Sequence, residues 1–549
     1  MSKVTYLSLG GSGNVTQNMH VLETEKDIII LDAGIGFPDT DQFGVDVVIP
    51  DISYLYPKLK KIKAIMISHA HEDHIGGLPY LIEDLGRPPI YATKLARGFI
   101  ENKLEEHNRL KNQSMVLVEP EKGPITLGDF TIYPYHVNHS IPDALGYFIK
   151  TPIGNIVFSP DFKFDWTPVD NVLFDVAKLT DLAKDGVHTL ISDCLGSTRE
   201  GYTQSERTIQ KAFENEISDA KGQVFITTMS SNISRVQQAI NASIKYNRRV
   251  VPVGRSIERN IEIAGKLGYL NAPDGVVVSM DEARRMKPSK LTYIVAGSFG
   301  QKGSSLDRLS RGEHRMVHLK DNAVVIFSAD PIPGVYDQVG SVIDNLMARG
   351  VRVVYSDIQD DMHVSGHGSK GDLSIMIGLT RPKYFIPIGG QIRHQHGYKD
   401  LVEDMGFDPR SVFILTDGQT VQLTQNHAQT GKPIELRDVF VDGRLVGNVG
   451  KTILEERMQL GQEGMLGVIV AKHGDKLDSH VQILSKGFVF KPESDELITA
   501  VANQAKGIIG KRKVAEWNKV KDELEKKIGS HIYSKVKRRP MVVATLVDA

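Results

Sequence analysis

Cysteine, tryptophan and long apolar runs are scarce in this chain of 549 residues. It has two tryptophans and one cysteine, Cys194, which excludes an internal disulfide and a zinc site built from several thiolates. No run approaches the ~18 apolar residues of a membrane-spanning helix, and the opening MSKVTYLSLGG lacks the pattern of a secretory signal. We therefore expect a protein of the reducing cytoplasm with no membrane partner.

Neither sign of charge is in excess, with 66 Lys and Arg against 67 Asp and Glu and a net charge of −1. This balance neither favours nor excludes nucleic acid as a partner. Basic residues are concentrated in residues 506–539, where twelve Lys or Arg accompany four Asp or Glu. That stretch is either a surface for phosphate groups or the solvated face of a C-terminal helix.

Length and composition, 41% hydrophobic and 24% charged, are typical of a soluble globular protein with two to four domains. Short β-rich segments first alternate with turns, which favours a sandwich. From residue 204, short apolar strands alternate with helices of about 10–15 residues, which predicts a parallel, doubly wound sheet. A helix-prone stretch from Asp495 to Ile528 belongs to a small last domain. The predicted segments are 1–203, 204–362, 363–424 (a return to the first domain), 425–450 (a linker) and 451–549.

The most informative segment is His69-Ala-His71-Glu-Asp73-His74, which directly follows the apolar run 64–67. That run is typical of a buried strand, so its ligands are expected at one edge of a sheet. Imidazole nitrogen and carboxylate oxygen suit zinc and similar metals. The spacing predicts a dinuclear centre, with His69 and His71 on one metal and Asp73 and His74 on the other.

Further ligands are expected where later strands end. His139 follows the strand FTIYPYHV and suits the first metal, whereas His136 falls within that strand and is expected to be packed. Asp161 ends another strand, and its carboxylate is placed to bridge both metals. Two such metals lower the pKa of water toward ~7 and stabilise charge on attacking and leaving oxygens. The sequence therefore predicts a hydrolytic site.

The segments HAHEDH, NHSIPD and PDFKFD together resemble the metallo-β-lactamase fold, and the SGH turn at Ser365–His367 resembles its β-CASP branch. GVDVVIPDISYL, SNISRVQQAI, LSRGEHR, PIPG, VSGHGS and the FVDG region extend the similarity to the ribonuclease J family over nearly the whole chain. The resemblance implies an αββα sandwich with an inserted β-CASP domain and a small C-terminal domain. It also implies 5′-to-3′ exonuclease activity, preferring 5′-monophosphorylated RNA, and endonuclease activity in rRNA processing and mRNA decay.

The resemblance also implies roles for individual residues. His69, His71 and His139 would hold one zinc and Asp73 and His74 a second, with Asp161 shared and Mn²⁺ or Mg²⁺ as alternatives. Asp73 also counts as catalytic, and Asp193 would orient His367, which protonates the leaving 3′-oxygen. The residues implied to contact RNA and its terminal phosphate are Ser231, Asn232, Ser234, Arg235, His363, Val364, Ser365, Gly366, His367 and Ser369. A helix N-cap explains Ser231 and Asn232 nearly as well.

The chain departs from the family pattern beside the second metal. Where the family has the histidine of His-Gly-Glu, this chain has Gly389, and His394 or His396 would have to fold back to replace it. Other departures lie at residues 159–161, 192–196, 296–302 and 335. We expect an active or partly active nuclease. The resemblance of the C-terminal domain implies a homodimer or homotetramer, and RNA-decay components are further candidate partners. The alternative is an impaired, RNA-binding paralogue that serves as partner subunit of an active ribonuclease J.

Overall fold

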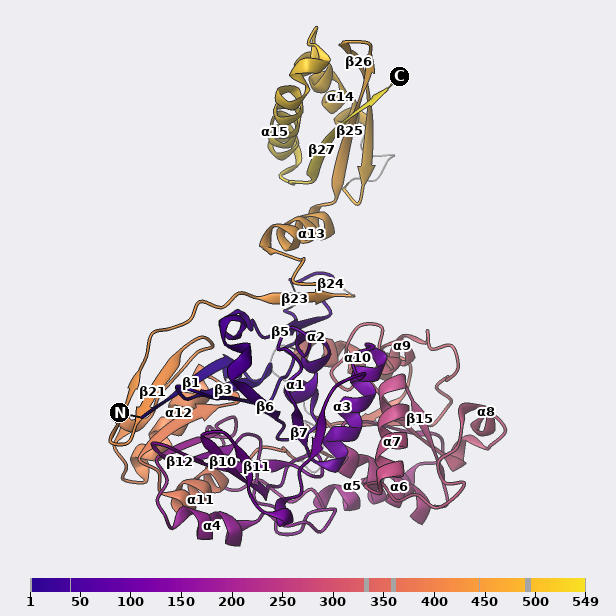
Figure 1. Cartoon of the computed structure of the whole chain (residues 1–549). Coiled ribbons are helices and arrows are strands. Elements are labelled where there is room, and N and C mark those ends of the chain that lie inside the picture. The colour runs from indigo at the N-terminus through magenta and orange to yellow at the C-terminus, as the bar shows by residue number, and fades with distance from the viewer. Residues whose placement is uncertain are drawn as a thin grey trace. The chain divides into compact units, whose positions relative to one another are not determined.

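The computed structural model describes residues 2–39, 41–329, 335–356, 362–443, 445–488 and 495–548. The PIPG segment at 331–334 lies outside these residues. The chain forms two compact units, each described by itself (Figure 1). Unit 1 comprises residues 1–37 and 48–438, and unit 2 comprises residues 38–47 and 439–549. The finer division at residues 203, 362 and 424 stays a prediction.

Two mixed sheets pack face to face in unit 1. The first has the order β22 (His427–Thr430), β21 (Thr420–Thr424), β1 (Lys3–Gly10), β3 (Met19–Glu23), β4 (Ile28–Leu31), β6 (Ile62–Met66), β7 (Ile90–Ala92) and β8 (Met115–Leu117). The second has the order β19 (Tyr384–Ile388), β13 (Thr189–Asp193), β12 (Gly154–Ser159), β11 (Leu145–Thr151), β10 (Phe130–His136) and β9 (Ile125–Leu127). One buried cluster joins side chains of both sheets, among them Tyr6, Leu31, Tyr147 and Phe158.

Helices cover the outer faces of these sheets. Against the second sheet, the buried side chains Leu179, Met376 and Val402 come from α4 (Val176–Ala183), α11 (Lys370–Thr380) and α12 (Ile392–Asp404). On the first sheet, α3 (Lys94–Glu106) contacts β7 and β8 and is joined by the single turns α1 (Glu72–Ile75) and α2 (Leu78–Leu81). The predicted αββα sandwich is confirmed.

The inserted part of unit 1 has a five-stranded, wholly parallel sheet. Its order is β15 (Arg249–Val253), β16 (Leu291–Val295), β14 (Val224–Thr227), β17 (Val324–Phe327) and β18 (Arg352–Val354). The central strands β14 and β17 are buried along their whole length, as strands covered on both faces are. The helices are α5 (Thr208–Asp219), α6 (Ile233–Lys245), α7 (Arg255–Leu267), α8 (Met280–Ala283), α9 (Ser305–Arg311) and α10 (Tyr336–Ala348). The predicted doubly wound domain is confirmed.

Unit 2 contains the helix α13 (Lys451–Glu463) and a small α/β sheet. Its strand order is β26 (Lys476–Lys486), β25 (Met465–His473) and β27 (Met541–Asp548), and apolar residues of two further helices cover it. The helix-prone stretch from Asp495 to Ile528 is not one helix. It forms α14 (Asp495–Ile509) and α15 (Trp517–Val536), because Gly510 takes a positive φ of 52° that ends the first. Among the described residues, no helix has the length and apolarity needed to cross a membrane.

The strand ends of unit 1 gather its polar side chains. Strands β12, β13 and β19 run parallel, with Ser159 beside Ser192 and Asp193 beside Ile388. Strands β4 and β6 run parallel in the other sheet, with Leu31 beside Met66. Because parallel strands end at the same edge of a sheet, the loops that follow them meet at one end of the sandwich.

Candidate active site

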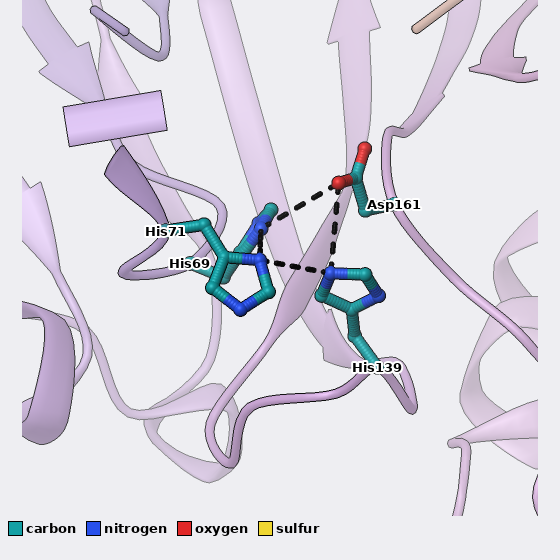
Figure 2. Close-up of side chains that lie close together, drawn as sticks. All are labelled: His69, His71, His139 and Asp161. Carbon is teal, nitrogen blue, oxygen red and sulfur yellow. Dashed lines mark hydrogen bonds and ion pairs between the residues drawn. The ribbon is translucent and has the colours of Figure 1, made fainter. Parts of the chain in front are cut away.

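Four buried side chains form the first ligand cluster, which Figure 2 shows: His69, His71, His139 and Asp161. His71 Nδ1 lies 3.1 Å from His69 Nε2 and 3.0 Å from His139 Nε2. Asp161 Oδ2 lies 3.7 Å from His69 Nε2 and 3.6 Å from His139 Nε2. Four nitrogen and oxygen atoms at these separations surround a single point, as the ligands of one metal do.

Asp161 also belongs to a second cluster with Asp73 and His74. His74 Nε2 lies 3.3 Å from Asp161 Oδ2 and 3.6 Å from Asp73 Oδ2. His71 caps the N-terminus of α1, and Asp73 and His74 lie in its only turn. A short helix directly after β6 therefore turns successive side chains toward two adjacent points, with Asp161 between them.

Hydrogen bonds on the far side of the imidazoles fix their tautomers. His139 Nδ1 donates to the carbonyl oxygen of Gly366 at 2.8 Å, and His74 Nδ1 donates to Asp32 Oδ2 at 2.8 Å. In both rings Nε2 faces the cluster. Asp32 also accepts bonds from the backbone N–H and the hydroxyl of Ser68. Such outer contacts orient metal ligands and raise their basicity.

The charges of the cluster suit a divalent cation. Burial, with the neighbouring histidines, holds the pKa values of His69 and His71 well below the usual range and lowers the pKa of His139 to about 4. Burial raises the pKa of Asp161, but His74 and His367 outweigh it and hold this pKa well below its ordinary value. Neutral imidazoles around an ionised carboxylate are the donor set of zinc and similar metals. The residues present therefore fit a divalent metal.

A histidine–aspartate pair faces the same carboxylate. His367 Nδ1 lies 2.7 Å from Asp193 Oδ2, and His367 Nε2 lies 3.7 Å from Asp161 Oδ2. Asp193 is fully buried at the end of β13. Burial lowers the pKa of His367, but the two carboxylates outweigh it and raise the pKa to about 9. The imidazole is therefore held protonated beside the ligand clusters.

These groups open into a cleft of about 800 Å³ within unit 1. Its lining includes His71, Asp73 and Asp161 together with residues of the inserted domain. The inserted domain contributes hydroxyl, amide and guanidinium groups to the lining: Ser231, Asn232, Arg255, Ser298, Ser304 and Arg308. A cleft that combines acidic and imidazole groups with neutral and cationic donors suits a phosphate-bearing chain.

Protein-family models match three parts of the chain: the metallo-β-lactamase superfamily at residues 12–193, the ribonuclease J β-CASP domain at 221–346 and the ribonuclease J C-terminal domain at 452–549. Ribonuclease J2 of Bacillus subtilis strain 168 is 32% identical, over 99% of this chain and 98% of that protein. The chain belongs to the ribonuclease J family. The resemblance drawn from the sequence motifs is confirmed. The predicted enzyme class, a nuclease that hydrolyses phosphodiesters, is confirmed with it.

Other members of the ribonuclease J family are similar over the same extent. Ribonuclease J 1 of Streptococcus pyogenes serotype M3 is 34% identical over 99% of this chain and 97% of its own length. Ribonuclease J of Thermus thermophilus is 34% identical over 99% of this chain and 95% of its own length. A crystal structure of an Enterococcus faecalis V583 protein of unknown function shares the fold, with a TM-score of 0.51 and 17% identity over 78% of this chain and all of that chain.

The structure places six of the predicted RNA contacts on the cleft: Ser231, Asn232, His363, Ser365, Gly366 and His367. Asn232 is also the N-cap of α6, where its side chain accepts the N–H of Arg235, so the N-cap interpretation of this residue is confirmed. Ser369 caps α11 and Val364 is buried. Ser234 lines a separate small pocket. Contact of each of these residues with RNA stays a prediction.

Arg235 lies behind the cleft rather than in it. Its side chain is fully buried, and its guanidinium donates to Glu206 Oε2 at 2.6 Å and to Ser328 Oγ at 2.6 Å. The buried Lys163 ammonium donates to Glu206 Oε1 at 3.1 Å and to the Ser365 carbonyl at 3.0 Å. Glu206 therefore ties the inserted domain to the loop of His367. No local motif marks this carboxylate, which lies in an ordinary polar stretch.

Gly389 is the departure that lies beside the shared carboxylate. It follows β19 with a φ of +68°, and a Cβ at this position would lie 3.6 Å from Asp193 Oδ1 and 3.8 Å from Asp161 Oδ1. The side chain that the family has here would thus point into the second cluster. His394 Nδ1 instead accepts the Gln391 N–H at the start of α12, and His396 is exposed. His136 is partly exposed and pairs with Glu121 rather than packing in the core.

Proposed function

We propose that this chain is a metal-dependent ribonuclease that cleaves RNA in the cleft of unit 1, by 5′-to-3′ exonuclease action on 5′-monophosphorylated ends and by endonuclease action, in the cytoplasm. The observation that carries the proposal is the position of the His367–Asp193 pair. It faces Asp161, the carboxylate shared by the two ligand clusters, and so sets an acid beside the metal ligands. A phosphodiester held at the clusters has its leaving oxygen within reach of that acid.

His69, His71, His139 and Asp161 would hold one metal, and Asp73, His74 and Asp161 a second. Bound divalent metals lower the pKa of water and stabilise the negative charge that develops on phosphate oxygens. The protein supplies the proton. Asp193 holds the Nδ1–H of His367, so Nε2–H faces the cluster and protonates the departing 3′-oxygen.

The RNA strand is gripped by the walls of the cleft. Ser231 and Asn232 face it from the N-terminus of α6, where backbone N–H groups and the helix dipole favour phosphate. Arg199 lines the cleft and donates to the Ser365 hydroxyl at 3.0 Å, which places a cation beside the His367 loop. Phosphate contacts of this kind fix the position of the RNA strand and do not recognise its base sequence.

The test is a time course on 5′-monophosphorylated and 5′-hydroxyl RNA with added Zn²⁺ or Mn²⁺, comparing the wild type with Gly389→His. The proposal expects mononucleotide release by the wild type, faster from the 5′-monophosphorylated substrate. Fragments from a circular RNA would report the endonuclease action separately. No hydrolysis of any of these substrates by metal-loaded wild type would contradict the proposal.

A second function is favoured by Gly389, because the second cluster lacks the family's histidine. In this alternative the chain is an impaired, RNA-binding subunit that pairs with an active ribonuclease J, within a dimer or tetramer. This alternative predicts about one bound metal per chain, and RNA hydrolysis only by the Gly389→His variant. Two metals per chain with wild-type mononucleotide release would exclude it.

A further inference from the structure

Asn18 directly precedes β3 and lies against the second ligand cluster. Its side chain is 1% exposed. The amide nitrogen lies 3.1 Å from His74 Nε2 and 3.3 Å from Asp73 Oδ2. The amide oxygen at the other end is also buried and has no hydrogen-bond partner among the described residues. The amide nitrogen therefore lies beside two ligand atoms, while the amide oxygen, which is the better metal ligand, faces away from the cluster.

The separations in the second cluster are those of a four-ligand site. Metal bonds of roughly 2.0–2.2 Å give a tetrahedron with edges of roughly 3.3–3.6 Å. The edge from His74 Nε2 to Asp161 Oδ2 is 3.3 Å and the edge to Asp73 Oδ2 is 3.6 Å. The Asn18 amide atom adds edges of 3.1 and 3.3 Å to His74 and Asp73. Its distances to His74 and Asp73 are those of a neighbouring ligand of the same tetrahedron.

The backbone holds Asn18 in this position. Its N–H donates to the carbonyl of Asp73 at 2.9 Å, and its own carbonyl accepts the Gly34 N–H at 2.9 Å. Gly11, at a φ of +90°, leaves room for the amide, because a Cβ there would lie 2.3 Å from Asn18 Oδ1. The Gly11 carbonyl in turn accepts the Gly389 N–H at 2.8 Å. Asn18 is thus fixed to the helix turn of Asp73 and, through Gly11, to the strand end that lacks a histidine.

We propose that Asn18 is a ligand of the second metal, which it binds through its amide oxygen in a cluster to which Gly389 adds no side chain. This rests on the proposed function, since it presumes a second metal. A half turn of the amide exchanges its oxygen and nitrogen without changing its shape. With a cation at the cluster, the lone pairs of His74 and Asp73 point to it, and an amide N–H beside it is repelled. The amide oxygen is attracted there, as in other sites that use Asn carbonyls.

The test measures zinc bound per chain against buffered free zinc, with no RNA present. Asn18→Leu keeps the shape of the amide and removes its donor atom, so the first zinc should bind unchanged and the second at least ~10-fold more weakly. Asn18→Asp supplies a carboxylate oxygen and should keep two zincs. Adding Gly389→His to Asn18→Leu should restore the second zinc. Asn241→Leu, on the exposed face of α6, is the matched control.

Two results would overturn the proposal. If Asn18→Leu binds two zincs as tightly as the wild type, Asn18 is not a ligand. If Asn18→Asp loses the second zinc as Asn18→Leu does, Asn18 acts by donating its N–H to Asp73 and His74. Thermal unfolding with chelator present verifies that each variant folds. Because zinc is counted without RNA, a wild type that binds two zincs and hydrolyses nothing refutes the proposed function while the role of Asn18 stands.

Discussion

Glu206→Gln should destabilise unit 1 far more than an ordinary change of a glutamate. The substitution keeps the shape of the side chain and removes its charge. Lys163 and Arg235, both 0% exposed, then lose the carboxylate that pairs with both of their positive charges. The carboxylate also fixes the segment before His367, because Lys163 donates to Ser365 and Arg235 donates to Ser328, whose hydroxyl binds the Met362 carbonyl.

The expected loss is in the free energy of unfolding of unit 1. Breaking a buried ion pair by removing one partner typically costs about 3–5 kcal/mol. Burial raises the pKa of Glu206, but Arg235 and Lys163 outweigh it and lower the pKa from 4.5 to about 2, which at ~1.4 kcal/mol per pH unit corresponds to roughly 3–4 kcal/mol. Because the folded pKa is depressed, this stability is fully present above pH 4.5 and is lost as the pH falls through 2.

Tryptophan fluorescence isolates the transition of unit 1. Trp166, which stacks on Phe164, lies in unit 1, and Trp517 lies in unit 2. In a Trp517→Phe background, urea unfolding at pH 7 should show a loss of about 3 kcal/mol for Glu206→Gln. The control is Glu214→Gln, whose partner Lys245 is exposed, with an expected loss below about 1 kcal/mol. Equal losses in the two variants, or an unchanged loss at pH 3, would refute the reasoning.

Three further outcomes are expected. Asp32→Ala removes the acceptor of the His74 Nδ1–H and should weaken zinc binding about 10–100-fold, measured by competition with a chromophoric chelator; unchanged affinity would contradict this. His367→Gln should lower the RNA cleavage rate about 10²–10⁴-fold with zinc content unchanged, and loss of zinc would show a structural role instead. Prolonged EDTA treatment should abolish cleavage, and added Zn²⁺ or Mn²⁺ should restore it; activity that survives verified removal of metal would exclude metal dependence.

The sequence was most informative where ligands follow one another along a single strand end. His69, His71, Asp73 and His74 stand within six residues, so one buried strand and one helix turn suffice to place them. His139 and Asp161 were found by the same rule applied to later strands. The parallel sheet of the inserted domain was recognised because its strand–helix alternation is regular and each strand is uniformly apolar.

Residues whose partners are remote in sequence were missed. Asp32 lies 42 residues from His74, and Glu206 lies 29 residues from Arg235 and 43 from Lys163. Only the fold brings these groups together, and their local sequence is that of any strand end or loop. Arg235 was expected to meet phosphate because it stands beside Ser231 and Asn232. The helical turn that presents those two residues to the cleft directs Arg235 inward, toward Glu206.

The two ligand clusters therefore differ in the strength of their donors as well as in the number of their ligands. The first is formed by three neutral imidazoles and a carboxylate, all buried. In the second, Asp161, Asp73 and Asp32 outweigh the effect of burial and raise the pKa of His74 well above the usual value. A proton held there must leave before a metal binds. With a glycine at 389 and the neutral amide of Asn18 as a ligand, the second metal should bind after the first and more weakly. Nuclease activity should then rise with occupancy of the second cluster as the concentration of free metal is raised.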